Sequence, residues 1–233
     1  MTDSENCRED RAQRVYDLLL AEYGEADWRP RRSGFEQLIQ TILSANTNDR
    51  NSGRAFETLR RRFNDDWDAV RTAPLAQIKE AIRVAGMYNQ KAPHIVETLE
   101  MLHREEGVYS LDHVRGMEPR AAQTYLQSFP GVGHKTASIV LLFSYGMAAF
   151  PVDTHIQRQS QRIGISGPRA SAQKIKDLWE EAVPPETFFT LHVNLIRHGR
   201  DVCRARVPRC GQCVLRNECD YVAGSGAWRE VKG

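Results

Sequence analysis

Long hydrophobic runs are absent from this sequence of 233 residues. The most apolar stretch, residues 137–152, is shorter than a membrane span and is interrupted by Ser144, Gly146 and Pro151. It therefore predicts a core helix followed by a loop. The first ten residues, MTDSENCRED, are polar and acidic, and they lack the apolar segment of a secretory signal. We expect a soluble protein that stays inside the cell.

Signals for β-strands are missing as well. The sequence contains no Asn-Gly or Asp-Gly pair and no short runs that alternate apolar and polar residues. Residues 34–45 instead have the apolar spacing of an amphipathic helix. Further helices are expected over residues 50–62, 74–84, 91–105, 119–127, 134–144, 154–163, 171–182 and 188–198. The expected fold class is all-α, and the chain is long enough for one large or two small domains.

A nucleotide-binding P-loop is also absent, although residues 128–143, SFPGVGHKTASIVLLF, come close to one. The P-loop pattern needs glycines where this chain has Phe129 and His134. The segment is better interpreted as helix, tight turn and helix. Amides of the turn and of the following helix start would be free to bind an anion, such as a nucleic-acid phosphate.

Strong net charge is missing, because the formal charge is only +2. Its distribution is uneven. Residues 197–216 contain Asp201 and six arginines, which gives +5 there and leaves about −3 for the rest of the chain. A basic patch of this kind fits a polyanion such as nucleic acid, whereas a solvated charged surface is the alternative. The six are Arg197, Arg200, Arg204, Arg206, Arg209 and Arg216.

Cysteine is scarce outside one short segment. Cys203, Cys210, Cys213 and Cys219 follow the spacing C-x6-C-x2-C-x5-C, whereas Cys7 stands apart and is interpreted as an incidental thiol. A reducing compartment favours metal binding over disulfides for such a cluster. Structural zinc usually uses two Cys-x-x-Cys pairs, and this segment has only one. The spacing by itself leaves zinc and a four-iron cluster open.

These motifs together resemble the endonuclease III family of iron-sulfur helix-hairpin-helix DNA glycosylases. The resemblance covers roughly residues 30–222. It rests on ILSANTND (42–49), GMYNQKA (86–92), FPGVGHKTAS (129–138), VDTH (152–155) and HGRDVCRARVPRCGQCVLRNEC (198–219). It implies a [4Fe-4S] cluster as cofactor. It also implies two helical domains with a DNA-binding cleft between them: residues 27–147 as a six-helix barrel with the hairpin, and residues 1–26 plus 148–233 as the cluster domain.

The resemblance assigns the catalytic roles to Lys135 and Asp153. Lys135 would attack C1′ of the sugar, displace the base and form a Schiff base that permits β-elimination. The amine attacks only when neutral, and the positive end of its helix favours loss of the proton. Asp153 would shuttle a proton or stabilise positive charge on the sugar. The alternatives are a solvated lysine at a helix start and an N-cap for residues 154–163.

DNA contacts follow from the same resemblance. Gly131 and Gly133 would bring amides to a phosphate, and Met87 would fill the gap left by a flipped nucleotide, unless it is a core methionine. Asp49 is either a pocket residue or the cap of residues 50–62. Asn46 stands where the resembled enzymes usually carry glutamine, and His134 where an arginine is usual. The remaining expected contacts are Arg204 and Arg206 of the basic segment.

The predicted function is a base excision repair enzyme, both DNA glycosylase and abasic-site lyase, that acts on oxidised pyrimidines of the thymine glycol type. Its partner would be double-stranded DNA that contains damaged bases or abasic sites, and a monomer is expected. The expected location is cytoplasmic and associated with the bacterial nucleoid, or otherwise intracellular. Two alternatives are a mismatch or monofunctional glycosylase of the same fold and a non-catalytic DNA-binding module. Lys135 together with Asp153 favours the lyase.

Overall fold

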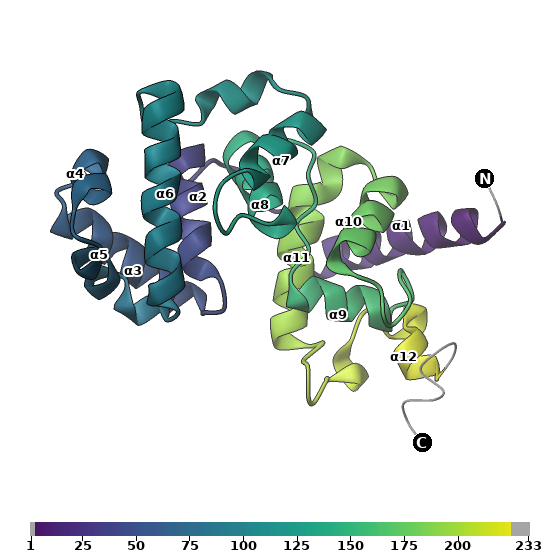
Figure 1. Ribbon diagram of the computed structural model, residues 1–233. Helices are drawn as coiled ribbons and strands as arrows, with labels where there is room; N and C mark the ends of the chain where they lie inside the picture. Colours follow the sequence, from purple (N-terminus) through teal and green to yellow (C-terminus); the bar gives the residue numbers. More distant parts are fainter. Residues whose placement is uncertain (1–2, 225–233) are drawn as a thin grey trace. The chain divides into compact units, whose positions relative to one another are not determined.

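The computed structural model describes residues 3–224, and these contain helices and no strand, which confirms the all-α prediction (Figure 1). The described residues form two compact units. One takes its residues from Met1–Trp28 and Ala148–Gly233, and the other is Arg29–Met147. We call them the split unit and the central unit. No helix of the described chain is long and apolar enough to cross a membrane.

The central unit is built around α2, which packs against α3, α6 and α8. Its α-helices are α2 (Gly34–Ser44), α3 (Asp49–Arg62), α4 (Trp67–Thr72), α5 (Leu75–Ala81), α6 (Tyr88–Glu106), α7 (Pro119–Gln127) and α8 (His134–Tyr145). Two 3-10 turns, η1 (Arg83–Ala85) and η2 (Asp112–Gly116), join them.

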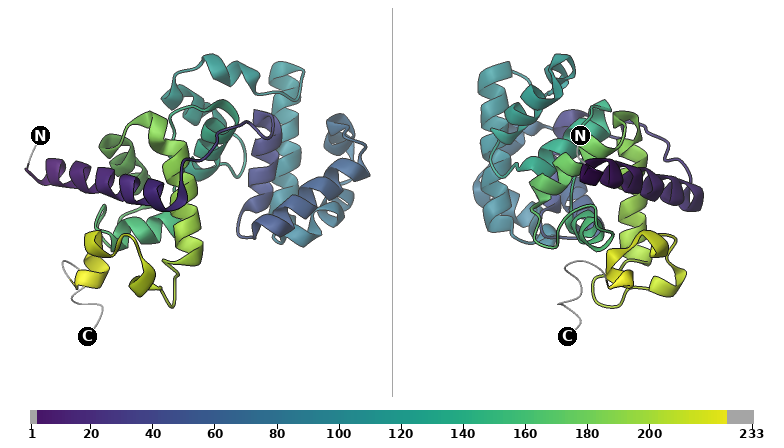
Figure 2. Two further views of the ribbon diagram at one scale, coloured as in Figure 1. Left: turned by 180° about the vertical axis from the view of Figure 1, so that it is seen from behind. Right: turned by 90° about the vertical axis from the view of Figure 1, so that its right-hand side faces the viewer.

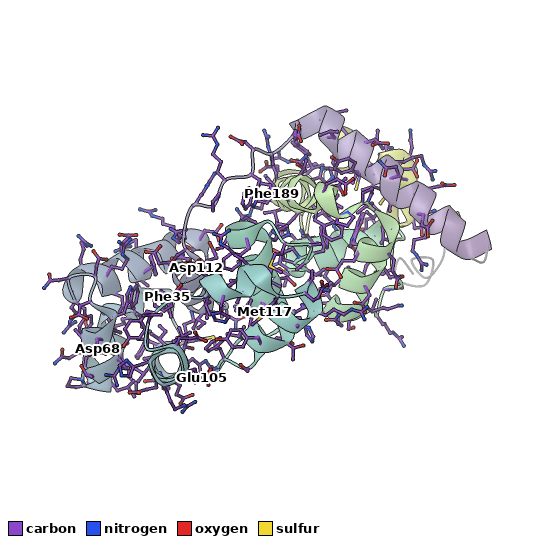
Figure 3. All side chains as sticks on the ribbon, turned by 90° about the horizontal axis from the view of Figure 1, so that it is seen from above. Phe35, Asp68, Glu105, Asp112, Met117 and Phe189 are labelled. Atoms are coloured by element: carbon purple, nitrogen blue, oxygen red, sulfur yellow. The ribbon has the colours of Figure 1, made fainter. Side chains whose placement is uncertain are left out.

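The start of α2 follows directly from its sequence. Ser33 Oγ accepts a bond from the Glu36 amide at 3.2 Å, and Glu36 Oε2 accepts one from the Ser33 amide at 3.3 Å. Such a capping box contributes about 1 kcal/mol. The apolar face then buries Leu38 and Ile39 completely. Phe35, which is labelled in Figure 3, meets the Trp67 ring edge-on at 5.0 Å.

Two elements of the central unit differ from the sequence prediction. The helix expected over residues 74–84 is instead α5 followed by η1, which Gly86 ends with a φ of 63°. α6 begins at Tyr88 rather than at residue 91, and its first turns tolerate Pro93. The short helix α4 was not predicted, although Asp66 caps it by accepting bonds from the Asp68 and Ala69 amides.

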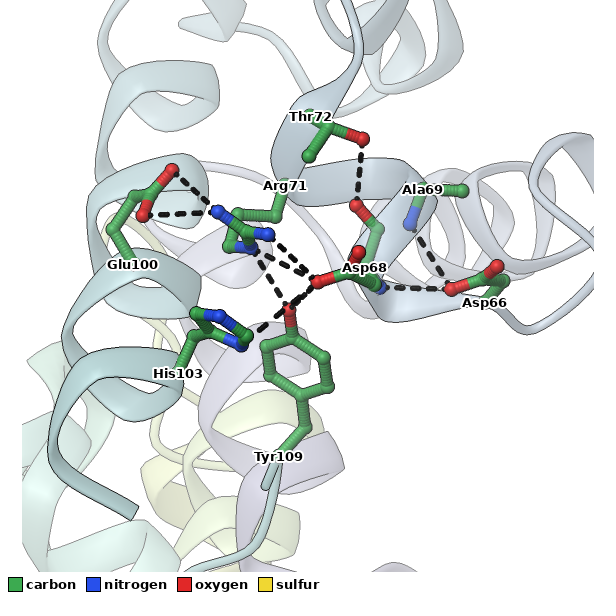
Figure 4. A network of polar contacts seen from close by, with 8 residues as sticks. All are labelled: Asp66, Asp68, Ala69, Arg71, Thr72, Glu100, His103 and Tyr109. Carbon is green, nitrogen blue, oxygen red and sulfur yellow. Dashed lines mark hydrogen bonds and ion pairs between the residues drawn. The ribbon is translucent and has the colours of Figure 1, made fainter. Parts of the chain in front are cut away.

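A polar network fastens α4 to α6 (Figure 4). Asp68 Oδ1 accepts bonds from Tyr109 Oη at 2.8 Å and from Arg71 Nη2 at 2.9 Å, and Arg71 Nη1 reaches Glu100 at 3.2 Å. The Tyr109 and Arg71 bonds lower the pKa of Asp68. The His103 ring stacks on Tyr109 at 6.3 Å. Because Asp68 and Glu100 are exposed, this network contributes little beyond orienting the two helices.

The split unit packs α1 against α10 and α11, so that residues from both ends of the chain share one core (Figure 2). Its helices are α1 (Asp3–Tyr23), α9 (Thr154–Arg162), α10 (Ala172–Ala182), α11 (Phe188–Asp201) and α12 (Asp220–Ala223), with the 3-10 turns η3 (Pro185–Thr187), η4 (Cys210–Gln212) and η5 (Arg216–Glu218). In the core, buried Trp179 donates to Ser160 Oγ at 2.8 Å, and this bond ties α10 to α9.

Candidate active site

The two glycines in the turn between α7 and α8 differ in backbone conformation and in the space around them. Gly131 has a φ of 73°, which favours glycine, and a Cβ there would clash with the imidazole of His94. Gly133 has an ordinary φ of −95°, and a Cβ there would meet no atom within 4 Å. It is the N-cap of α8 and offers no capping side chain. The first amides of α8 are therefore open to an anion, with no side chain competing for them.

Lys135 is the second residue of α8 and is exposed, within the same turn as those amides. His134 precedes it as the first helical residue and is exposed as well. This end of α8 thus presents an exposed lysine and uncapped amides on the surface of the central unit.

Asp153 is the N-cap of α9 in the split unit, as one of the two sequence interpretations predicted. Its Oδ1 accepts bonds from the amides of His155 and Ile156, both at 2.9 Å. Both bonds use the same oxygen, so Oδ2 remains for another role. The carboxylate is half-buried at the N-terminus of α9.

Asn46 and Met87 come together at the tips of two loops in the central unit. Asn46 Nδ2 lies 3.3 Å from Met87 Sδ, although 41 positions separate the two residues. Both have left-handed backbones, with φ values of 51° and 48°, which is uncommon for residues other than glycine. Met87 is 43% exposed, so its interpretation as a core methionine is wrong.

Asp49 does not cap the helix that follows it. Asn48 has the extended backbone of an N-cap, and its side chain accepts a bond from the Asn51 amide at 2.9 Å. Asp49 is already the first helical residue of α3 and is exposed. The capping interpretation of Asp49 is therefore wrong, while its role in a pocket stays a prediction.

The segment from Cys203 to Cys219 surrounds a cavity that all four of its cysteines line. Cys213 Sγ lies 3.3 Å from His198 Nε2, and Arg162 Nη1 donates to Cys203 Sγ at 3.4 Å. Burial raises the pKa of Cys213 to about 11 and also raises that of Cys219. Ionised thiolates in this cavity would therefore need a compensating cation.

Single-ion geometry is missing from this cavity. Within the described chain, no three His, Cys, Asp or Glu side chains are arranged to hold one metal ion. Both a zinc ion and a four-iron cluster take four thiolate ligands, so the four thiols by themselves leave both open.

Two arginines of α9, which the sequence reasoning missed, hold the backbone of this segment. Arg162 donates to the carbonyls of Arg204 at 2.8 Å and Ala205 at 3.0 Å, and Arg158 Nη2 donates to the Cys203 carbonyl at 2.8 Å. The i, i+4 spacing of the two arginines was the available signal. Because α9 fixes the backbone, the side chains of Arg204 and Arg206 are left exposed.

Comparison with known proteins gives one consistent result. The protein-family model described as "HhH-GPD superfamily base excision DNA repair protein" matches residues 39–185 of this chain. Endonuclease III of Sulfolobus acidocaldarius is 34% identical over 191 residues, which is 82% of this chain and 83% of that protein. Endonuclease III of Escherichia coli is 35% identical over 191 residues, or 81% of this chain and 84% of that protein.

Solved structures agree with the sequence relatives. A trapped endonuclease III–DNA covalent intermediate superposes with a TM-score of 0.80 at 27% identity, covering 92% of this chain and 97% of the other. A non-covalent endonuclease III–DNA complex also reaches 0.80, at 26% identity, covering 97% and 99%.

Proposed function

The chain belongs to the endonuclease III family within the HhH-GPD superfamily of base excision DNA repair proteins, and from this premise we propose that it removes oxidised pyrimidines from duplex DNA through Lys135. As a member of that family it is a DNA glycosylase with abasic-site lyase activity, and DNA is its partner. One observation carries the assignment of the nucleophile: an exposed lysine beside uncapped amides at the start of α8.

DNA would be held through its phosphates on surfaces of both units. The amides at Gly133 and the first turn of α8 fit one phosphate, because no side chain blocks their approach. The exposed arginines Arg204 and Arg206 would grip another part of the backbone. A base inside the stack is out of reach, so the damaged nucleotide must flip out, and Met87 with Asn46 would fill the space that it leaves.

In the reaction, the neutral amine of Lys135 attacks C1′ and the bond from C1′ to the base breaks. The sugar ring opens to give a Schiff base between C1′ and the lysine nitrogen. Loss of a proton from C2′ then expels the 3′ phosphate. Asp153 would stabilise the positive charge that develops on the sugar and accept or return a proton through Oδ2.

Borohydride trapping tests this assignment. With duplex DNA that contains thymine glycol or an abasic site, wild-type protein should give a covalent adduct, and Lys135→Gln should give none while still binding DNA. Lys174→Gln, an exposed lysine at the start of α10, is the matched control and should trap as wild type does. Binding without any adduct by the wild type would favour a non-catalytic DNA-binding module.

We further propose that Cys203, Cys210, Cys213 and Cys219 hold a [4Fe-4S] cluster. The shared cavity and the cysteine spacing C-x6-C-x2-C-x5-C, which resembles that of the iron-sulfur members of the family, support this choice over zinc. When bound, the cluster would cross-link the segment that carries Arg204 and Arg206. Purified protein should contain about four irons and four labile sulfides per chain, with broad visible absorption. Zinc without iron would contradict the proposal.

A further inference from the structure

Lys91 is a buried lysine that the proposed mechanism does not use. Its side chain is only 3% exposed, and Nζ donates to the carbonyls of Leu43 and Ala85, both at 2.8 Å. Lysine is almost never buried to this extent unless it is paired. Burial lowers its pKa, whereas the C-terminal ends of two helices favour a cation at this place. Lys91 therefore joins the end of α2 to the end of η1.

Each of these two carbonyls lies shortly before a left-handed residue. Leu43 is three residues before Asn46, and Ala85 is two residues before Met87. A left-handed backbone is unfavourable at any residue other than glycine, so both loops need support from their surroundings. The side chains of Asn46 and Met87 then contact each other directly.

We propose that Lys91 is a positioning residue that holds Asn46 and Met87 side by side in the conformation that enters the DNA helix beside a flipped nucleotide. The inference rests on the proposed function of the two loop tips. Without the Lys91 bonds, both helix ends lose a donor and both loops are free to relax to ordinary backbone conformations. The pair would then separate, and the energy that it contributes to opening the duplex would be lost.

This role predicts a selective defect. Lys91→Met keeps the length of the side chain and removes its donors. On duplex DNA with thymine glycol, where a base must be flipped and its place filled, kcat/KM should fall by about tenfold to a hundredfold. The comparison substrate is a duplex in which an abasic site lies opposite a one-nucleotide gap. Here no damaged base has to be flipped out and no opposing base has to be displaced. Cleavage of that substrate should stay within about twofold of wild type.

A double-mutant comparison shows whether Lys91 acts through the loop tips. Asn46→Ala with Met87→Ala should reduce cleavage of the intact duplex, and adding Lys91→Met should reduce it no further, because the residues act as one unit. If Lys91→Met does not fold, Lys91→Gln is the second variant. Its side chain is one bond shorter, so its amide cannot reach both carbonyls, and it should show the same selective loss.

The contradicting results differ from those that would overturn the proposed function. Equal losses of kcat/KM on both substrates, or an additive loss in the triple variant, would show that Lys91 only stabilises the fold. A wild-type protein that cleaves neither substrate would instead overturn the proposed function itself.

Discussion

At the level of the single residue, Asp153 caps a helix and has a proposed catalytic role, and substitutions can separate the two. Its Oδ1 caps α9 through the His155 and Ile156 amides, and its charge is proposed to act on the sugar. α9 also carries Arg158 and Arg162, which hold the cysteine segment. Loss of the cap would therefore disturb more than the catalytic group.

Two substitutions of Asp153 separate these duties. Asp153→Asn keeps an oxygen that can cap the helix, so the free energy of unfolding in urea should change by less than about 0.5 kcal/mol. Asp153→Ala removes the cap and should cost about 1 kcal/mol. Both should slow single-turnover base removal by about a hundredfold or more. An asparagine variant with the wild-type rate would leave Asp153 with the capping duty alone.

The sequence reveals residues whose role depends on type and local spacing. Lys135 follows a glycine turn, and four of the five cysteines lie within seventeen consecutive positions, so both features stand out from the sequence alone. Lys91 does not stand out, because its partners Leu43 and Ala85 come together only when α2, η1 and α6 pack. The contact between Asn46 and Met87 has the same origin.

At the level of the element, the two glycines in the turn between α7 and α8 are needed for different reasons. Gly131 is required by the protein itself, through its φ of 73° and the nearby His94 ring. Gly133 has an ordinary backbone and open space around it, so the fold alone does not demand glycine there. The proposed close approach of a phosphate would supply the missing reason.

Alanine at each position tests that distinction. Gly131→Ala should lower the free energy of unfolding by about 1–3 kcal/mol, because both strain and a clash result. Gly133→Ala should leave unfolding unchanged or slightly stabilise the protein, yet weaken binding to duplex DNA by about fivefold to tenfold. If Gly133→Ala binds DNA as tightly as wild type, the phosphate does not approach at this amide.

Element boundaries were the least predictable part of the fold. The amphipathic pattern of α2 predicted it well, because its apolar face is also its buried face. α4 has only six residues, too few for a periodic pattern, and only its Asp66 cap marks it. α6 begins at Tyr88, three residues before the predicted start at residue 91. The residue before it, Met87, adopts the left-handed conformation, which no sequence rule assigns to methionine.

At the level of the whole molecule, the proposed catalytic pair is divided between the two units. Lys135 belongs to the central unit, and Asp153 belongs to the split unit with the cysteine segment. The basic charge is concentrated in that segment, at +5 over residues 197–216, against about −3 elsewhere. DNA affinity should therefore depend on salt mainly through the split unit.

The salt dependence of binding measures this directly. Arg204→Ala or Arg206→Ala should each reduce the slope of log K against log salt by about 1, since each arginine displaces one counterion. Arg104→Ala is the matched control: this exposed arginine lies near the far end of α6 from Met87, and the slope should not change. Unchanged slopes for Arg204→Ala and Arg206→Ala would remove this segment from the interface.

The central claim is that Lys135 forms the covalent bond to DNA, and mass mapping of the borohydride-trapped adduct tests it most directly. After digestion of protein and DNA, the sugar remnant should be found on the peptide that contains Lys135 and on no other. A remnant on another amine, including Lys91 or Lys174, or an adduct that persists in Lys135→Gln, would contradict the claim.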